Sequence, residues 1–279
     1  GFRQGVFIAA KLYPAKATTN SAAGGCDFSK ISLVLERMEA IDMPLLIHGE
    51  VTDPDVDVFD REALFIQRHL LPLRERYPRL RIILEHITTE EAVTYIREAY
   101  LDGDERIAAT ITPHHLHLNR NAMFVGGLRS DFYCLPVVKR ECHRRALVQA
   151  ATSGLPCFFL GTDSAPHPRS GKESACGCAG IFNAFHALES YATVFEQEGA
   201  LDRLEGFASE YGPHFYGLPL NSDTVTLVRR DQTIPSRLLP PQSARSGDDT
   251  LPESEWPLLF HAGETLAWCV EMNGHSHGN

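Results

Sequence analysis

Four short apolar runs in this chain each lead directly to a residue that can bind a metal ion. Runs of this length, bounded by turn signals, are typical of buried strands in a parallel sheet. In barrels of parallel strands, the chemistry lies at the C-terminal strand ends. The pattern therefore predicts a metal site on one rim. The runs are 5–10 before Lys11, 44–47 before His48, 81–85 before His86 and 156–162 before Asp163.

Composition limits the class of protein. Of the 279 residues, 43% are hydrophobic and 22% are charged, as in a globular protein with a sizeable core. The net charge of -10 argues against a nucleic-acid partner, because phosphate contacts need clustered lysine and arginine. No apolar stretch is long enough to predict a membrane span. Seven cysteines at scattered spacings favour a reducing cytoplasm over a disulfide framework.

Helical patterns alternate with the apolar runs. We expect two further strands at 106–112 and 132–135, and helices following residues 30, 60 and 89 and at 139–153 and 182–197. Alternating strands and helices predict a parallel α/β sheet with right-handed crossovers. An open doubly wound sheet is the alternative, but it gives no reason for metal-binding residue types at four strand ends.

Six expected strands fall two short of a (β/α)₈ TIM-type barrel. The chain starts at Gly1 without methionine and enters a strand within five residues. We therefore expect a barrel whose first two strand–helix units are missing from this chain, with strands 3 to 8 in residues 1–218. Residues 219–279 are expected to form a C-terminal extension packing on the barrel, with disordered last residues.

The strand-end residues fit metal chemistry as a set. Neutral imidazoles of His48 and His86 are good zinc ligands, although either one alone reads equally well as a structural histidine. Asp163 follows a wholly apolar strand, where a carboxylate must be paired, metal-bound or used as a helix cap. Four residues later, His167 could hydrogen-bond an anionic substrate or be an ordinary loop histidine.

Lys11 is the most informative of the four. Burial at a strand end lowers a lysine pKa, and the neutral amine can react with CO₂ to give a carbamate. The two carbamate oxygens could bridge two metal ions. The alternative is an ion pair with a carboxylate. Two other groups are expected to be loop residues without metal, namely His114-His115-Leu116-His117 and Cys176-Gly177-Cys178.

Several motifs in one order closely resemble dihydroorotase of the shorter bacterial type, in the amidohydrolase superfamily. The resemblance covers residues 5–218 and resumes at 259–268. The motifs are KLYPAKATTNS at 11–21, LIHGE at 46–50, EHITT at 85–89, YCLP at 133–136, GTDSAPH at 161–167 and CGCAG at 176–180.

This resemblance implies a hydrolase of cyclic amides that interconverts N-carbamoyl-L-aspartate and L-dihydroorotate in pyrimidine biosynthesis. It implies two zinc ions bridged by Lys11 as N6-carboxylysine, formed with CO₂. His48 and His86 would bind the second zinc, and Asp163 would bind the first and act as catalytic base. The implied substrate-binding residues are His48, Leu135, His167 and Ala179, with Thr18 and Thr19 on a loop that closes over the site.

One part of the family pattern is missing. The family carries a His-x-His motif on its first strand, followed by an arginine and an asparagine for the substrate carboxylate, and these have no counterpart in the 279 residues. We therefore expect little or no activity from this chain alone. The alternatives are another cyclic-amide hydrolase, such as a hydantoinase, and a non-catalytic barrel that binds partners. A homodimer is consistent with the resemblance.

Overall fold

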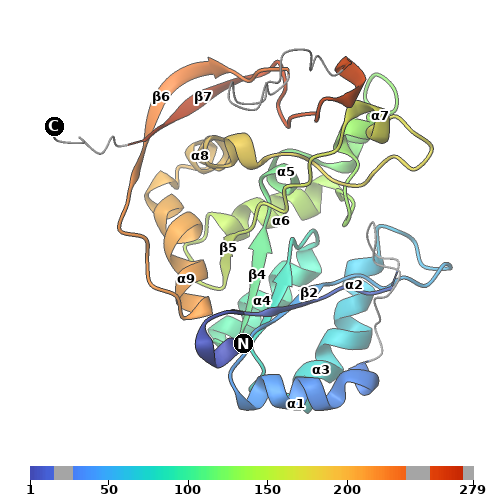
Figure 1. The fold of residues 1–279 in the computed structure, drawn as a ribbon, viewed down its shortest axis with the longest axis vertical. Coiled ribbons are helices and arrows are strands. Elements are labelled where there is room, and N and C mark those ends of the chain that lie inside the picture. The colour runs from blue at the N-terminus through green and yellow to red at the C-terminus, as the bar shows by residue number, and fades with distance from the viewer. Residues whose placement is uncertain (16–27, 237–251, 273–279) are drawn as a thin grey trace.

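Five parallel strands form the centre of the molecule (Figure 1). The computed structural model describes residues 1–15, 28–236 and 252–272. Within these residues the strands lie side by side in chain order, and every neighbouring pair is parallel. The strands are β1 (Ala10–Leu12), β2 (Leu45–His48), β3 (Ile82–Glu85), β4 (Ile107–Ile111) and β5 (Phe158–Leu160).

The strand register brings the predicted site residues to the same end of the sheet. Lys11 lies opposite Leu46, and His48 lies opposite Glu85, one residue before His86. All five residues of β4 are buried, as its largely apolar sequence predicts for a strand covered on both faces. The C-terminal ends of β2 and β3 therefore place their two histidines next to each other.

Helices connect consecutive strands and cover the sheet. Thr89 caps α4, because its hydroxyl accepts a hydrogen bond from the amide of Ala92. A π-helical segment (Ile66–Leu70) joins α2 to α3, and a second one (Gly206–Glu210) precedes α9. The helices are α1 (Ser32–Ala40), α2 (Arg61–Phe65), α3 (Leu71–Arg76), α4 (Glu90–Leu101), α5 (Pro113–His117), α6 (Glu141–Ala151), α7 (Arg169–Lys172), α8 (Ala187–Gln197) and α9 (Tyr211–Tyr216).

Three local predictions were wrong. The first run, residues 5–10, was expected to be a buried strand that ends before Lys11. Only Ala10 of this run lies in β1, which has Lys11 as its central residue, and Val6 and Phe7 are exposed. The run 132–135 is not a strand: it follows a 3₁₀ turn (Ser130–Phe132) and leads into a cis Leu135-Pro136 bond. Cys134 is buried in a separate small cluster, against which the partly buried Phe132 packs, rather than by strand pairing. Residues 114–117 form most of the short helix α5, not a loop.

A two-stranded antiparallel ribbon follows the last helix of the sheet region. It consists of β6 (Val225–Thr233) and β7 (Thr265–Met272), and β7 packs against α8 (Figure 1). The extension expected from residue 219 onward thus contains ordered structure. The expected disorder of the last residues lies outside the described residues. Among the described helices, none has the length and apolar character required to cross a membrane.

Candidate metal and substrate site

Two histidines from neighbouring strands face each other across a distance suited to a metal ion. Nδ1 of His48 lies 3.2 Å from Nε2 of His86, and both side chains are buried. Tetrahedral zinc with ordinary Zn–N bonds separates two imidazole nitrogens by about 3.3 Å. Burial, together with the neighbouring His48, holds the pKa of His86 well below its usual value, so its ring is neutral and able to bind a metal.

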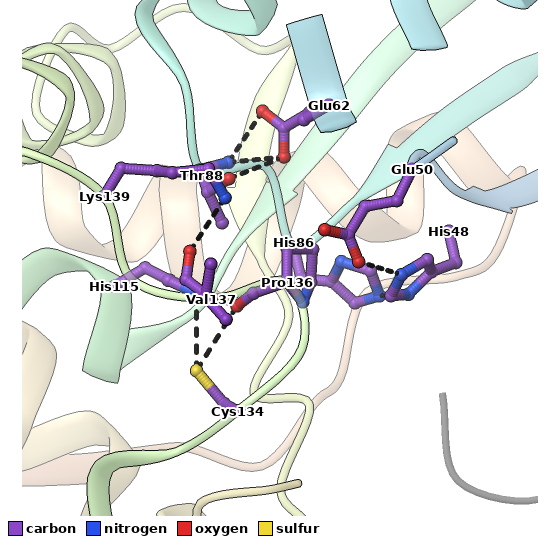
Figure 2. Close-up of polar contacts among 10 residues, drawn as sticks. All are labelled: His48, Glu50, Glu62, His86, Thr88, His115, Cys134, Pro136, Val137 and Lys139. Atoms are coloured by element: carbon purple, nitrogen blue, oxygen red, sulfur yellow. Dashed lines mark hydrogen bonds and ion pairs between the residues drawn. The ribbon is translucent and has the colours of Figure 1, made fainter. Parts of the chain in front are cut away.

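Glu50 fixes the orientation of His48. Its carboxylate lies 2.7 Å from Nε2 of His48, on the other ring nitrogen from the one that faces His86 (Figure 2). When Nε2–H donates to Glu50, Nδ1 carries the free lone pair that a metal needs. Nδ1 of His86 is buried without a hydrogen-bond partner. The donor set and its orientation therefore fit a zinc ion between the two rings.

A buried carboxylate holds the turn that carries His86. Glu62, from α2, accepts hydrogen bonds from the backbone amide and the hydroxyl of Thr88 (Figure 2). It also accepts from the amide and the hydroxyl of Thr89. The amide of His86 itself donates to the hydroxyl of Thr110, at 2.7 Å. These contacts fix the turn directly after β3, because nearly every polar group in it has a partner.

Backbone strain marks two of the strand ends. His86 has a φ of 44° and Asp163 a φ of 42°, both in the left-handed region that side chains with a Cβ adopt rarely. Residues in this region cost of order 1–3 kcal/mol and persist where the surroundings fix them, which is frequent at functional sites. Both residues belong to the predicted metal-binding set.

Lys11 lies beside two carboxylates at the same rim. Its ammonium pairs with Glu85, so the ion-pair alternative is present in the structure. Burial lowers the pKa of Lys11 to about 8, while the charge of Asp163 raises it. Burial also raises the pKa of Asp163, against the opposing charges of Lys11 and His48. Burial thus favours the neutral form of both groups, the amine of Lys11 and the carboxyl of Asp163.

A cavity of about 200 Å³ joins the metal-binding residues to the predicted substrate residues. His167 lies in its wall with Nε2 3.2 Å from the carbonyl oxygen of Ala179, to which it can donate. Thr18 and Thr19 lie outside the described residues. Six predicted site residues line this cavity: His48, His86, Leu135, Asp163, His167 and Ala179.

A second group of metal-ligand types lies deeper in the molecule. His114, His115 and Cys134 are buried with ligand atoms within 4.8 Å of one another. Both ring nitrogens of His115 already have partners, in Thr112 and the carbonyl of Pro136. Burial raises the pKa of the Cys134 thiol to about 12, which opposes the thiolate that a metal binds. Hydrogen bonding therefore accounts for His115, whereas Nε2 of His114 is buried without a hydrogen-bond partner.

Three supporting residues were missed by sequence reasoning: Glu50, Glu62 and Lys172. Each is a charged residue of a type that is normally exposed, and each is at most 2% exposed here. The available signal was the position of Glu50, two residues beyond a strand-end histidine. The partners of Glu62 are 26 and 27 residues away in the chain. Lys172 donates to main-chain carbonyls 39, 6 and 8 residues away, and such carbonyls leave no side-chain pattern in the sequence.

Comparison with known proteins identifies relatives along nearly the whole chain. No family model matches. Over 268 residues the chain is 66% identical to a dihydroorotase of Synechococcus sp. strain RCC307, covering 96% of this chain and 72% of that protein. It is 55% identical to a dihydroorotase of Erwinia tasmaniensis, covering 98% of this chain and 74% of the relative.

Solved structures agree with these relatives. Dihydroorotase from Saccharomyces cerevisiae in complex with 5-fluoroorotic acid matches with a TM-score of 0.85 and 35% identity, over 97% of this chain and 75% of that one. Campylobacter jejuni dihydroorotase gives 0.81 and 31%, over 96% and 72%.

L-Hydantoinase from Arthrobacter aurescens gives a TM-score of 0.74 at 16% identity, over 98% of this chain and 65% of that one, which supports the fold alone. The expected fold class, part of an amidohydrolase TIM-type barrel, is confirmed. The chain belongs to the dihydroorotase family of metal-dependent cyclic-amide hydrolases.

Proposed function

We propose that this chain carries the zinc- and substrate-binding rim of a dihydroorotase, which interconverts N-carbamoyl-L-aspartate and L-dihydroorotate. The observation that supports this most directly is the cavity in which His48, His86, Asp163 and His167 meet. Its volume of about 200 Å³ suits a single small ring. The yeast relative was solved with 5-fluoroorotic acid, a pyrimidine carboxylate of that size.

Four residues would hold the metal ions. We assign Lys11, as N6-carboxylysine, together with His48, His86 and Asp163 to a centre of two zinc ions. Bound zinc would supply Lewis-acid chemistry, polarising the ring carbonyl and lowering the pKa of water. The buried, neutral His86 and the Glu50-oriented His48 support this assignment, because both rings can present a free lone pair. Carboxylation of Lys11 would require its ammonium to leave Glu85.

Asp163 is proposed as the proton-transfer residue. In ring opening, water adds to the amide carbonyl, the ring C–N bond breaks, and the leaving nitrogen gains a proton. Asp163 would take the proton from the attacking water and return it to that nitrogen; ring closure is the reverse. Burial of Asp163 raises its pKa, which strengthens the carboxylate as a base.

The cavity wall provides polar groups for the substrate. His167 would face the substrate carboxylate, while Leu135 and Ala179 would contribute main-chain groups. We assign Thr18 and Thr19 to a loop that covers the bound ring and excludes water, in keeping with the family resemblance. We further propose a cytoplasmic enzyme that forms a homodimer and has no nucleic-acid or membrane partner.

Activity of the isolated chain is a separate question. The chain spans 72% of the Synechococcus relative. Because its 279 residues contain no counterpart of the family's first-strand His-x-His, we propose that it turns over little dihydroorotate by itself.

The test compares two proteins loaded with zinc and CO₂. One is the 279-residue chain, and the other is a fusion in which the part of the Synechococcus relative preceding the matched region is joined to Gly1. We expect dihydroorotate hydrolysis by the fusion, loss of it in the fusion carrying Lys11→Ala, and little in the chain alone. Turnover of hydantoin without turnover of dihydroorotate would contradict the proposal, and absence of all turnover in the fusion would favour a non-catalytic barrel.

A further inference from the structure

Lys172 is buried at the C-terminal end of α7 and uses all of its hydrogen-bonding capacity. Only 2% of the residue is exposed. Its ammonium donates to the carbonyl oxygens of Tyr133 at 2.7 Å, Cys178 at 2.9 Å and Gly180 at 2.7 Å. A protonated lysine has three N–H donors and no acceptor, so three carbonyls match it fully.

The three carbonyls belong to two chain segments that meet at the candidate substrate cavity. Tyr133 precedes Leu135, while Cys178 and Gly180 flank Ala179, and the cavity wall includes Leu135, Ala179 and Gly180. The carbonyl of Tyr133 also accepts a hydrogen bond from the amide of Gly180, at 2.9 Å. The Lys172 ammonium therefore links the segment of Tyr133 to the segment of Cys178 and Gly180 through their carbonyl oxygens.

We propose that Lys172 is a positioning residue that fixes the substrate-facing main chain of residues 133–136 and 178–180. The identity of the substrate rests on the function proposed above, whereas the arrangement of the two segments does not. Through this wall, Lys172 sets the positions of the main-chain groups beside Leu135 and Ala179. Displacement of such groups by an ångström is enough to weaken binding and catalysis strongly.

No other residue type would serve equally well at this position. Methionine has similar length but would remove the ammonium that donates to the carbonyls of Cys178 and Gly180, whereas Tyr133 would keep only the amide of Gly180 as a donor. Buried carbonyls without a donor are costly. Arginine presents a planar fork rather than a compact ammonium, so it cannot direct donors to the same three oxygens. Burial lowers the pKa of Lys172 to about 8, which leaves the group mostly protonated at neutral pH.

The helix that carries Lys172 is itself anchored by the C-terminal part of the chain. The amide of Arg169, the first residue of α7, donates to the carbonyl of Trp256 at 3.2 Å. Pro168 and Pro257 pair in an isolated antiparallel bridge. Because these contacts fix α7 from outside the barrel, they keep the ammonium in position behind the cavity wall.

The test uses the zinc-loaded 279-residue chain with Lys172→Met and Lys172→Gln. The matched control is Arg203→Met, which removes a cation that donates to the carbonyls of Thr152 and Ser153 away from the cavity. We measure hydrogen exchange of the Gly180 amide, dihydroorotate affinity by calorimetry, and zinc content. The Gln variant replaces the Met variant if the latter does not fold.

We expect Gly180 exchange to accelerate and dihydroorotate affinity to fall by about tenfold or more, with zinc content unchanged. The control should show neither change. Gly180 exchange equal to that of the wild type would overturn the proposal. A fall in dihydroorotate affinity that is explained by loss of zinc would also overturn it. If the wild-type 279-residue chain does not bind dihydroorotate, affinity is measured on the fusion protein described above. Absence of binding by that fusion would contradict the proposed function, and Gly180 exchange alone would still decide whether Lys172 fixes the wall.

Discussion

The carboxylate of Glu50 lies 2.7 Å from Nε2 of His48, whose other ring nitrogen faces His86 at 3.2 Å. This contact favours the tautomer of His48 that carries its proton on Nε2. A metal-binding histidine generally donates its second N–H to such a partner, which orients the ring and raises its basicity. The rim is thus organised by carboxylates behind the ligands as well as by the ligands themselves.

Substitution Glu50→Gln should weaken zinc binding by about 10- to 100-fold. The amide keeps the size of the side chain but loses the charge that favours Nε2–H on His48. Competition with a chelating dye measures the affinity. Glu264→Gln is the matched control, because Glu264 lies 2.6 Å from Nδ1 of His261 in a histidine–carboxylate pair outside the cavity. Equal zinc affinity in wild type and Glu50→Gln would show that Glu50 does not support the metal ligand.

Substitution Glu62→Ala should lower the free energy of unfolding by about 3 kcal/mol, because buried amide and hydroxyl donors of Thr88 and Thr89 lose their acceptor. Urea denaturation measures this loss. Glu98→Ala, at an exposed position of α4, should change stability by no more than about 0.5 kcal/mol. A Glu62→Ala protein as stable as the Glu98→Ala control would mean that water replaces the carboxylate at little cost.

The strand ends could be predicted from sequence because burial on both faces leaves a continuous apolar run. Four of the runs became β2 to β5 in chain order, and the runs at 44–47, 81–85 and 156–162 led to His48, His86 and Asp163 as expected. The run at 132–135 shows the limit of this rule. Cys134 is equally well buried in an irregular segment, and an apolar run does not distinguish strand pairing from packing in a satellite cluster.

The supporting charges could not be predicted, because their partners are distant in the chain or are main-chain groups that no sequence pattern marks. Glu62 and Thr88 are 26 residues apart, and Lys172 and Tyr133 are 39 apart. In sequence each reads as a residue of a solvated helix face. Only the folded chain shows that these charges are buried and matched to main-chain groups, which is the condition under which a buried charge is tolerated.

Carboxylation of Lys11 should follow the neutral fraction of its amine. With a pKa of about 8 in place of 10.5, about one amine in ten is neutral at pH 7, compared with about three in ten thousand without the shift. At fixed bicarbonate, the carbamate formed on the zinc-free chain should therefore rise as the pH increases through about 8 and then level off. Carbon-13 NMR with labelled bicarbonate measures it, with Lys11→Arg as the control. A midpoint near 10.5 would contradict the burial effect.

The cavity wall leaves no room for a side chain at Gly180, so substitution of this glycine tests the shape of the wall. Its φ is 148°, and an added Cβ would lie 2.5 Å from Cβ of Ala165 and 3.0 Å from Nε2 of His167. Gly177 provides the matched control, because its φ of 70° is also positive but its nearest neighbour, on Tyr133, is 3.6 Å away. Both alanine variants should lose about 1 kcal/mol of stability from backbone strain.

Only Gly180→Ala should also displace His167, because the new methyl group overlaps the imidazole ring and the facing Ala165. We expect dihydroorotate affinity to fall by about tenfold or more in Gly180→Ala and to stay within about twofold of wild type in Gly177→Ala. Calorimetric titration of the zinc-loaded proteins measures both, and urea denaturation separates binding from folding. Equal affinities in the two variants would place the substrate away from the His167 side of the cavity.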